Sequence, residues 1–482
     1  MSNIKQINTE QNLRCECLVI GSGPGGLLTS KKLVEQGFNT ILIEEGDFIK
    51  TSESEKYKNY QKINRLWRNG GITTSFGKTY ILYAEGSGVG GGAEINSGIM
   101  QRVSSEVFSD WVKNNDIKNF SFADLDSCYD KVLKLISPTE PENHPSSNIL
   151  SNSAENLGWK WEKLKIAYSA TGTKRSISSL ILDDMTTKGL QVFSNLNAQK
   201  IKYKNNKAYR VDCISMGKHK VTISFDHLFL AGGAIYSPFL LLKSGIKKAV
   251  GKTLQFHPTV KVGALFDHKI NSKPAIVPSV AITEFMPNVR IGGSVFTKGF
   301  FGMFLSEDWK KRSWLFNLSE YCGIYYAMIK PTGRAKIFKL PFLSDPVIFV
   351  SLTKHDKALL QVALNKLTQA MFAGGAKFVY PPIYNHDGWK EYKDEIFDNF
   401  KNLNLTTIHI FSSLPMGEND FCPVNSSGKL KHLDNVMVCD ASIIPSAPVT
   451  NPQAIIMALV ERNMDLFLKN ISPQPKNAQL KN

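Results

Sequence analysis

Three glycines near the start of the chain have a spacing that suits phosphate chemistry. Gly21, Gly23 and Gly26 form the pattern G-x-G-x-x-G directly after an apolar run. In a strand–turn–helix unit, the first glycine allows a tight turn, the second lets the backbone approach a pyrophosphate, and the third lets the helix pack against the strand. Glu44 follows Gly21 by 23 residues, close to the roughly 20 expected for a carboxylate that binds the adenosine ribose. The pattern predicts a dinucleotide site and does not by itself separate FAD from NAD.

The elements that would position these residues surround them in the sequence. Residues 17–20 and 40–43 are apolar runs typical of buried strands, and residues 27–36 have the character of a helix that ends at Gly37. The N-terminus of such a helix offers free N–H groups and a partial positive charge to a diphosphate. The alternative is a structural βαβ unit without a ligand. The residues of this stretch expected to bind the cofactor are Gly21, Ser22, Gly23, Pro24, Gly25, Gly26, Glu44 and Glu45.

The composition narrows the class of protein. A chain of 482 residues exceeds the usual single core, so two or three domains are expected. The net charge is +16, but no Lys/Arg-rich block accompanies it, which predicts a generally basic surface and no nucleic-acid partner. The 7 cysteines lack zinc-ligand spacing, and neither a signal peptide nor an apolar run of roughly 18 residues is evident. We expect a cytoplasmic protein with free thiols and no metal.

Beyond the first unit, strand-like and helix-like segments alternate. Ser121 is expected to cap a helix that runs to Leu135, with Asp124 as its reciprocal partner, and residues 139–190 show little period. Nucleotide-binding elements recur at both ends and in the middle of the chain, with a second domain inserted twice, which argues against a simple NAD dehydrogenase. Other expected elements are helices over 356–372 and 452–468, and strands over 192–194, 198–203, 209–213, 221–225 and 228–230.

Four stretches, in this order, resemble the glucose–methanol–choline (GMC) family of FAD oxidoreductases. The N-terminal βαβ unit is the first. Residues 88–99 (GVGGGAEINSGI) are similar to the family's first signature, and residues 230–246 (LAGGAIYSPFLLLKSGI) to its second. The fourth stretch begins at His409 and continues to Arg462. The resemblance covers the cofactor half of the chain, whereas residues 260–400 match only loosely.

The resemblance implies the fold and the domains. The fold would be α/β, with a Rossmann-like FAD-binding domain built on a doubly wound sheet and an inserted α+β substrate domain with a mainly antiparallel sheet. Because the glycine-rich segments 21–26 and 88–98 would hold one cofactor, we expect them side by side. The FAD-binding domain would comprise residues 1–100, 190–258 and 405–470, the substrate regions residues 101–189 and 259–404, and a polar tail residues 471–482.

The resemblance also implies how FAD is held. Glycines in the 88–92 loop would let main-chain N–H groups approach the flavin and diphosphate. Asn96 would turn inward from the same loop, or else close an Asx turn. Covalent members of the family carry a histidine directly before this asparagine, whereas this chain has Ile95, so non-covalent FAD is expected. Further expected contacts are Gly88, Val89, Gly90, Gly91, Gly92, Ala198 at the adenine, Gly232, Asp440, Ala441, Asn451 and Pro452.

His409 and Asn451 resemble the catalytic pair of the family. Alcohol oxidation moves a hydride to flavin N5, and an imidazole with an ordinary pKa of about 6.5 can take the hydroxyl proton. An amide offers a donor and an acceptor that can orient the hydroxyl. Since Pro452 follows, Asn451 is also expected to cap the last helix. The chain departs from the family motif where Ser412 and Ser413 replace Gly-Thr. His257 resembles a structural segment and is not expected to be catalytic.

The substrate is less well defined. Residues 296–328 are rich in aromatic side chains and contain Lys310, Lys311 and Arg312, which suits a bulky apolar alcohol or a membrane-surface entrance. The alternatives are a packed core, or stacking on a glycosyl substrate. The electron acceptor would be O₂ or another carrier. Alternative hypotheses for the function are a redox-silent FAD lyase and an NAD-dependent reductase.

Overall fold

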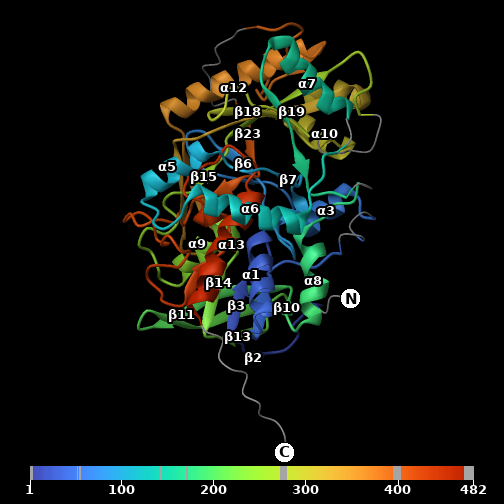
Figure 1. Ribbon diagram of the computed structural model, residues 1–482. Helices are drawn as coiled ribbons and strands as arrows, with labels where there is room; N and C mark the ends of the chain where they lie inside the picture. The colour runs from blue at the N-terminus through green and yellow to red at the C-terminus, as the bar shows by residue number, and fades with distance from the viewer. Residues whose placement is uncertain are drawn as a thin grey trace, which may run out of the picture.

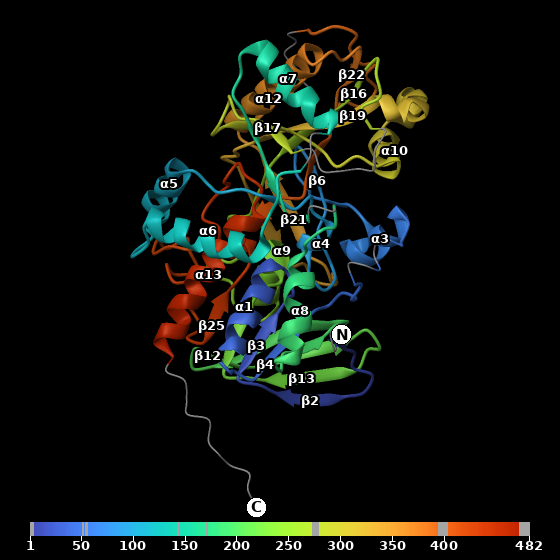
Figure 2. The same cartoon turned by 45° about the vertical axis from the view of Figure 1, so that its right-hand side comes forward.

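The protein consists of two stacked lobes joined by several crossings of the chain (Figures 1 and 2). One lobe is built on a parallel sheet and the other on a large, mainly antiparallel sheet, which confirms the predicted fold class. No helix in the described ranges is long and apolar enough to cross a bilayer. Most of the predicted polar tail, residues 472–482, lies outside the described residues. The computed structural model describes residues 4–50, 53, 56–141, 144–169, 172–271, 279–393 and 403–471.

A six-stranded sheet in which every pairing is parallel forms the centre of the first lobe. Its middle strands are buried apolar runs, as expected when helices cover both faces. The strand order reverses at β3, and ligands of doubly wound sheets bind at the carboxyl ends of the strands at such a point. In spatial order the strands are β1 (Ile4–Lys5), β10 (Gln191–Phe193), β4 (Thr40–Ile43), β3 (Cys17–Ile20), β14 (His227–Leu230) and β25 (Val436–Val438).

Helices pack around this sheet. Helix α1 (Pro24–Glu35) connects β3 to β4 and contacts both α13 (Gln453–Asn470) and α8 (Ile177–Thr187). Helix α6 (Phe122–Ile136) lies along α13 (Figure 2). It begins with the predicted capping box, in which Ser121 and Asp124 satisfy each other's backbone N–H groups. Two helices from the 101–189 segment therefore pack against the nucleotide-binding helices.

A small four-stranded sheet extends the same lobe. Strands β11 (Leu196–Lys204), β12 (Lys207–Ser215) and β13 (Lys220–Ser224) form an antiparallel meander. Strand β2 (Gln11–Arg14) adds to its edge in parallel. Because β11 starts directly after β10, this sheet brings Asn197 and Ala198 to the carboxyl edge of the six-stranded sheet.

The second lobe rests on a nine-stranded, mainly antiparallel sheet. Helices α12 (Lys354–Ala373) and α7 (Pro145–Leu157) contact each other and this sheet, and Figure 1 shows both at the end of the molecule away from α1. The strands are β5 (Thr73–Thr74), β6 (Ile81–Tyr83), β23 (Leu405–Thr407), β16 (Thr259–Leu265), β19 (Cys322–Ile329), β18 (Val289–Gly293), β17 (Val280–Ile282) and β8 (Trp161–Lys163) in order, with β22 (Phe378–Tyr380) also paired to β16.

Short elements complete the described chain. They include three two-stranded pairs and several short helices that connect the lobes. The pairs are β15 (Gln255–Phe256) with β24 (Ile410–Phe411), β20 (Arg334–Phe338) with β21 (Val347–Ser351), and β7 (Ile99–Met100) with β9 (Lys165–Ile166). The helices are α3 (Asn59–Leu66), η1 (Arg68–Gly70), α4 (Gly92–Ile95), α5 (Ser105–Asn115), α10 (Lys298–Ser306), α11 (Trp309–Arg312), η2 (Ser313–Tyr321) and η4 (Ala441–Ile443).

One expectation about an element was wrong, and one stretch contains helices for which the sequence made no prediction. Residues 139–190, which show little period, contain α7 and α8. Asn451 does not cap the last helix, because α13 begins at Gln453 with Pro452 in the cap position, and no side chain caps it. The amide of Asn451 is instead held by side chains of the second lobe, as described below.

Candidate active site

A cavity of about 470 Å³ lies where the two lobes meet. Residues that follow β3, β4, β14 and β25 line it, so it occupies the carboxyl edge of the parallel sheet, where a doubly wound fold binds its ligand. The predicted residues that line it are Gly21, Ser22, Gly23, Pro24, Gly25, Glu44, Glu45, Gly91, Gly92, Asn96, Ala198, Gly232, His409, Asp440, Ala441, Asn451 and Pro452.

Four other predicted residues do not line the cavity but shape the loops around it. Gly26 allows the close packing expected of it, because a Cβ there would meet the carbonyl oxygen of Gly21 at 1.9 Å. Gly90 donates its N–H to Ser22 Oγ at 3.1 Å, and Val89 is buried. Gly88 lies against the backbone of Asp47. These residues position the two glycine-rich turns.

The two turns contact each other as predicted. A Cβ on Gly91 would lie 2.9 Å from the Cα of Gly23. By contrast, a Cβ on Gly23, Gly92 or Gly233 would meet no protein atom within 4 Å, and all three residues line the cavity. Bare backbone therefore faces open space on several sides, which fits an elongated cofactor such as FAD whose phosphates are bound by main-chain N–H groups.

Three helices begin at the cavity. The N-caps of α1, α9 (Gly233–Lys243) and α13 are Gly23, Gly232 and Pro452, and all three line it. Each helix N-terminus carries a partial positive charge and free N–H groups. Their convergence favours a ligand with a negatively charged diphosphate.

Glu44 is held firmly at the carboxyl end of β4. One carboxylate oxygen accepts hydrogen bonds from the backbone N–H of Ser22 at 3.0 Å and from its hydroxyl at 2.7 Å, and the other accepts from the N–H of Gly46 at 3.0 Å. Burial raises the pKa of Glu44, with the neighbouring charge of Glu45 adding to the effect. Since Glu44 still lines the cavity, its carboxylate remains placed for the ribose role expected of it.

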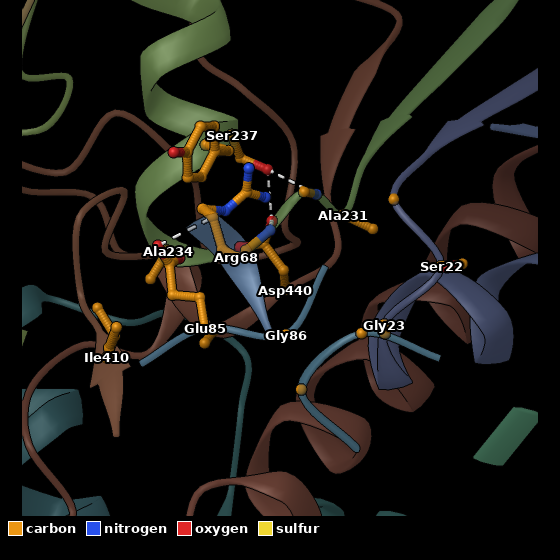
Figure 3. Close-up of a pocket in the computed structure, with 18 of the residues that line it drawn as sticks. Ser22, Gly23, Arg68, Glu85, Gly86, Ala231, Ala234, Ser237, Ile410 and Asp440 are labelled. Atoms are coloured by element: carbon orange, nitrogen blue, oxygen red, sulfur yellow. Dashed lines mark hydrogen bonds and ion pairs between the residues drawn. The ribbon is translucent and has the colours of Figure 1, made fainter. Parts of the chain in front are cut away.

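A charged cluster that the sequence did not indicate lies at one side of the cavity (Figure 3). The guanidinium of Arg68 pairs with Glu45 and lies 3.9 Å from the carboxylate of Glu85. It also stacks on the ring of Tyr236, 3.5 Å from its centroid. Ser22 and Gly23 lie on the opposite side of the same view. No motif contains Arg68, which begins η1 directly after Trp67, the C-cap residue of α3.

Asp440 and Asn96 join the cavity wall to the helices behind it. Asp440 accepts hydrogen bonds from the N–H groups of Gly233 at 2.9 Å and Ser442 at 2.8 Å, and burial raises its pKa. The amide of Asn96 donates to Gln453 at 2.6 Å, and its oxygen accepts from the N–H of Gly98 at 2.9 Å. Asn96 thus closes an Asx turn and faces the cavity at the same time, which unites the two expected roles.

His409 and Asn451 converge at the end of the cavity beside the second lobe. Asn451 Nδ2 lies 3.3 Å from His409 Nε2. On the other side of the ring, His409 Nδ1 lies 3.1 Å from Nδ1 of His257, which is fully buried. His257 Nε2 lies 3.1 Å from the backbone nitrogen of Val449. His257 therefore holds the His409 ring and leaves Nε2 directed at the amide, so it contacts the catalytic pair although its sequence context gave no sign of this.

Two cations from the second lobe act on this pair. Arg290 Nη1 donates to Asn451 Oδ1 at 2.9 Å, which fixes the amide with Nδ2 toward His409. Burial, followed by the charges of Arg290 and Lys261, lowers the pKa of His409 to about 3. The imidazole is therefore neutral near pH 7 and can accept a proton. Neither cation belongs to a recognisable motif, and only the pairing of distant strands brings them to the site.

Comparisons with known proteins agree with this architecture. The chain matches GMC oxidoreductase over residues 63–259 and 341–459. It is 36% identical to the uncharacterised GMC-type oxidoreductase y4nJ of Sinorhizobium fredii, over 97% of both chains. It is 24% identical to the long-chain-alcohol oxidase FAO3 of Arabidopsis thaliana, over 92% of this chain and 67% of that protein.

A solved structure shares the fold. The crystal structure of pyridoxine 4-oxidase from Mesorbium loti superposes with a TM-score of 0.71 and 15% identity, covering 95% of this chain and all of that one. The glycine-rich cradle, the order of the signatures and the 36% identical full-length relative lead to one assignment. The chain belongs to the GMC oxidoreductase family.

Proposed function

We propose that this protein oxidises an alcohol to an aldehyde or ketone with non-covalently bound FAD, with His409 as the base and Asn451 positioning the hydroxyl. The observation that carries the proposal is the 3.3 Å approach of His409 Nε2 and Asn451 Nδ2 at the end of the cavity. GMC oxidoreductases depend on FAD, which accepts a hydride at N5 when it is bound.

The chain's own residues supply the remaining steps. A hydroxyl placed between His409 Nε2 and the amide of Asn451 can donate its proton to the imidazole in the tautomer that carries its own proton on Nδ1, and Asn451 Nδ2, which faces Nε2 at 3.3 Å, favours that tautomer. The lowered pKa keeps this imidazole neutral. Arg290 holds the Asn451 oxygen, so the amide presents its N–H₂ group as a donor to the hydroxyl oxygen.

The residues around the cavity fit FAD held without a covalent bond. Glycine backbone, three helix N-termini and Glu44 would hold the diphosphate and ribose. Ile95 also lines the cavity, and its aliphatic side chain offers no atom for covalent attachment to the flavin. The purified protein should be yellow and should release its flavin on acid precipitation. Colour that stays in the pellet would contradict the Ile95 argument.

The substrate proposed from the sequence was a bulky apolar or glycosyl alcohol, with O₂ or another carrier as the acceptor. In the structure, part of the aromatic stretch 296–328 forms a separate buried cluster that includes Phe301, Phe304 and Tyr380. None of the described residues 296–328 lines the cavity. The packed-core alternative therefore explains Phe301 and Phe304, though not Tyr326, which lies outside this cluster, and relatives named for long-chain-alcohol oxidation give the remaining support for an apolar chain.

Anaerobic mixing with a panel of alcohols tests the proposed function. Bleaching of the yellow flavin absorbance by at least one alcohol is expected. A yellow protein that no alcohol bleaches would favour the redox-silent lyase. A colourless protein that binds NADH would favour the NAD-dependent reductase.

A further inference from the structure

The face of the large sheet that meets His409 and Asn451 carries polar side chains in register. Lys261 on β16 pairs with Tyr326 on β19, and Tyr326 pairs with Gly292 on β18. Arg290 lies two residues before Gly292 on the same strand, so its side chain leaves the sheet on the same face. A Cβ on Gly292 would meet the Tyr326 hydroxyl at 2.6 Å, which places that hydroxyl over β18, close to Arg290.

This face reaches the catalytic pair directly. Arg290 donates to Asn451, and the charge of Lys261 contributes to the lowered pKa of His409. The contact of Arg290 crosses from the second lobe to Asn451. Three strands therefore bring Lys261, Tyr326 and Arg290 to the second-lobe side of the catalytic pair, behind the residues that line the cavity.

Most of the hydrogen-bond donors on Lys261, Tyr326 and Arg290 have no acceptor. Arg290 is fully buried, and its Nε and Nη2 atoms have no partner. Within the described ranges, neither the Lys261 ammonium nor the Tyr326 hydroxyl makes a hydrogen bond or an ion pair. Burial lowers the pKa of Lys261, although the charge of Glu307 opposes this effect. A buried cation left unpaired is strongly destabilising, so these groups call for a partner that a bound ligand can supply.

No carboxylate in the described part of the chain neutralises Arg290 by an ion pair. The acid nearest in effect to Lys261 is Glu307, which already accepts from Asn404 Nδ2 at 3.0 Å and lies 3.5 Å from Arg312. An alternative explanation is that Arg290 only orients Asn451. This explains the hydrogen bond of Arg290 Nη1, but it gives no acceptor to Arg290 Nε and Nη2, to Lys261 or to Tyr326. The missing component is therefore an acceptor-rich, negatively charged group.

We propose that the alcohol oxidised here carries a carboxylate, which pairs with Arg290 and Lys261 and accepts from Tyr326 while its hydroxyl lies at His409 and Asn451. This inference rests on the proposed function. In the reaction the carbinol C–H electron pair leaves as hydride to FAD, the hydroxyl proton goes to His409, and the carbon–oxygen bond becomes double. The carboxylate is unchanged, so the product is an oxo acid, and a carboxylate outside the reacting bonds fixes the distance between anion and hydroxyl.

The test compares hydroxy acids of increasing length with their methyl esters, in anaerobic flavin reduction by the FAD-loaded protein. We expect at least one acid to reduce the flavin about 10⁴-fold more efficiently than its ester, the lower end of the scale on which a site with buried polar groups rejects an analogue that leaves them unpaired. In Lys261→Met and Arg290→Met this preference should fall about tenfold or more. Lys377→Met removes an equal charge from an exposed position on the same lobe and should keep it.

A second measurement does not require turnover. Carboxylic acids that lack the hydroxyl should perturb the visible flavin spectrum of the wild type on titration, and Lys261→Met should weaken this binding. Lys261→Met is the key variant, because it leaves the Arg290–Asn451 contact intact if Arg290→Met fails to fold. Replacing carboxylic acids by alkyl phosphates shows whether the site prefers a carboxylate or accepts any oxyanion, and tighter phosphate binding would overturn the carboxylate assignment.

The outcomes separate the two proposals. If unreactive acids bind but no alcohol bleaches the flavin, the proposed oxidation fails and the anion site remains. If neutral alcohols bleach the flavin as efficiently as the matching acids, the oxidation holds and the carboxylate inference fails. The inference also fails if Lys261→Met slows acids and esters equally, because the cations would then serve the flavin and not the substrate.

Discussion

The two walls of the active site are built in different ways. The cofactor wall is made largely of backbone, and its carboxylates Glu44 and Asp440 are satisfied by nearby N–H groups. The substrate wall is made of side chains that project from sheet strands, and Arg290 is left with two unpaired nitrogens. A wall that binds an invariant cofactor can be complete in the protein alone, whereas a wall that selects a substrate is completed only by that substrate.

The largest effect is expected from a substitution that displaces the backbone of the cofactor wall. In Gly26→Val the new Cβ would lie 1.9 Å from the Gly21 carbonyl oxygen, and because the contact is with backbone, the turn must move. We expect a colourless or unstable protein. Gly92→Ala is the matched control, since its Cβ would meet no protein atom within 4 Å. It should keep the fold and the thermal midpoint, and lower only the affinity for FAD, measured by fluorescence on flavin release.

The next largest effect is expected from replacing His409, where the cofactor wall and the substrate wall meet. His409→Ala should retain yellow FAD, because the glycine backbone and the helix N-termini that would hold the diphosphate are unchanged. Flavin reduction should slow by about 10²-fold or more, the usual scale for loss of a general base. Stopped-flow absorbance under anaerobic conditions measures this rate. Reduction at the wild-type rate would mean that the base is elsewhere.

A smaller effect is expected for Asn451, because it orients the hydroxyl and does not accept its proton. Asn451→Ala should slow reduction by about tenfold, in line with the loss of one hydrogen bond worth roughly 1.5 kcal/mol. The variant also leaves Arg290 Nη1 without its acceptor, so the midpoint of thermal unfolding should fall as well. Asn451→Asp supplies a carboxylate to Arg290 and should restore stability without restoring the rate, which separates the two roles.

The difference between the two walls also explains which parts of the site could be predicted from the sequence. Strands β3 and β4 coincide with the predicted runs 17–20 and 40–43, and the contact between the two glycine-rich turns was predicted, because backbone binding requires glycine at fixed spacing. Lys261, Arg290 and His257 were missed as contributors, since each is a single residue in an ordinary strand or loop. Their meeting depends on the register of strands far apart in the chain, which local sequence does not encode.

The smallest expected effect is that of pH on the rate of flavin reduction. A base acts in its unprotonated form, and with an ordinary pKa of about 6.5 its active fraction would fall about 30-fold between pH 8 and pH 5. Because burial, Arg290 and Lys261 lower the pKa of His409 to about 3, the neutral form persists, and the rate of flavin reduction should stay nearly constant across this range. Other groups must be considered, since the pKa of His257 is also lowered whereas burial raises that of Glu307. Burial also raises the pKa of Glu85, which lines the cavity, to about 7. Glu307→Gln and Glu85→Gln therefore serve as controls. A loss of rate at low pH that either variant abolishes belongs to that carboxylate, and one that persists in both would mean that His409 titrates normally and that the substrate wall does not depress its pKa.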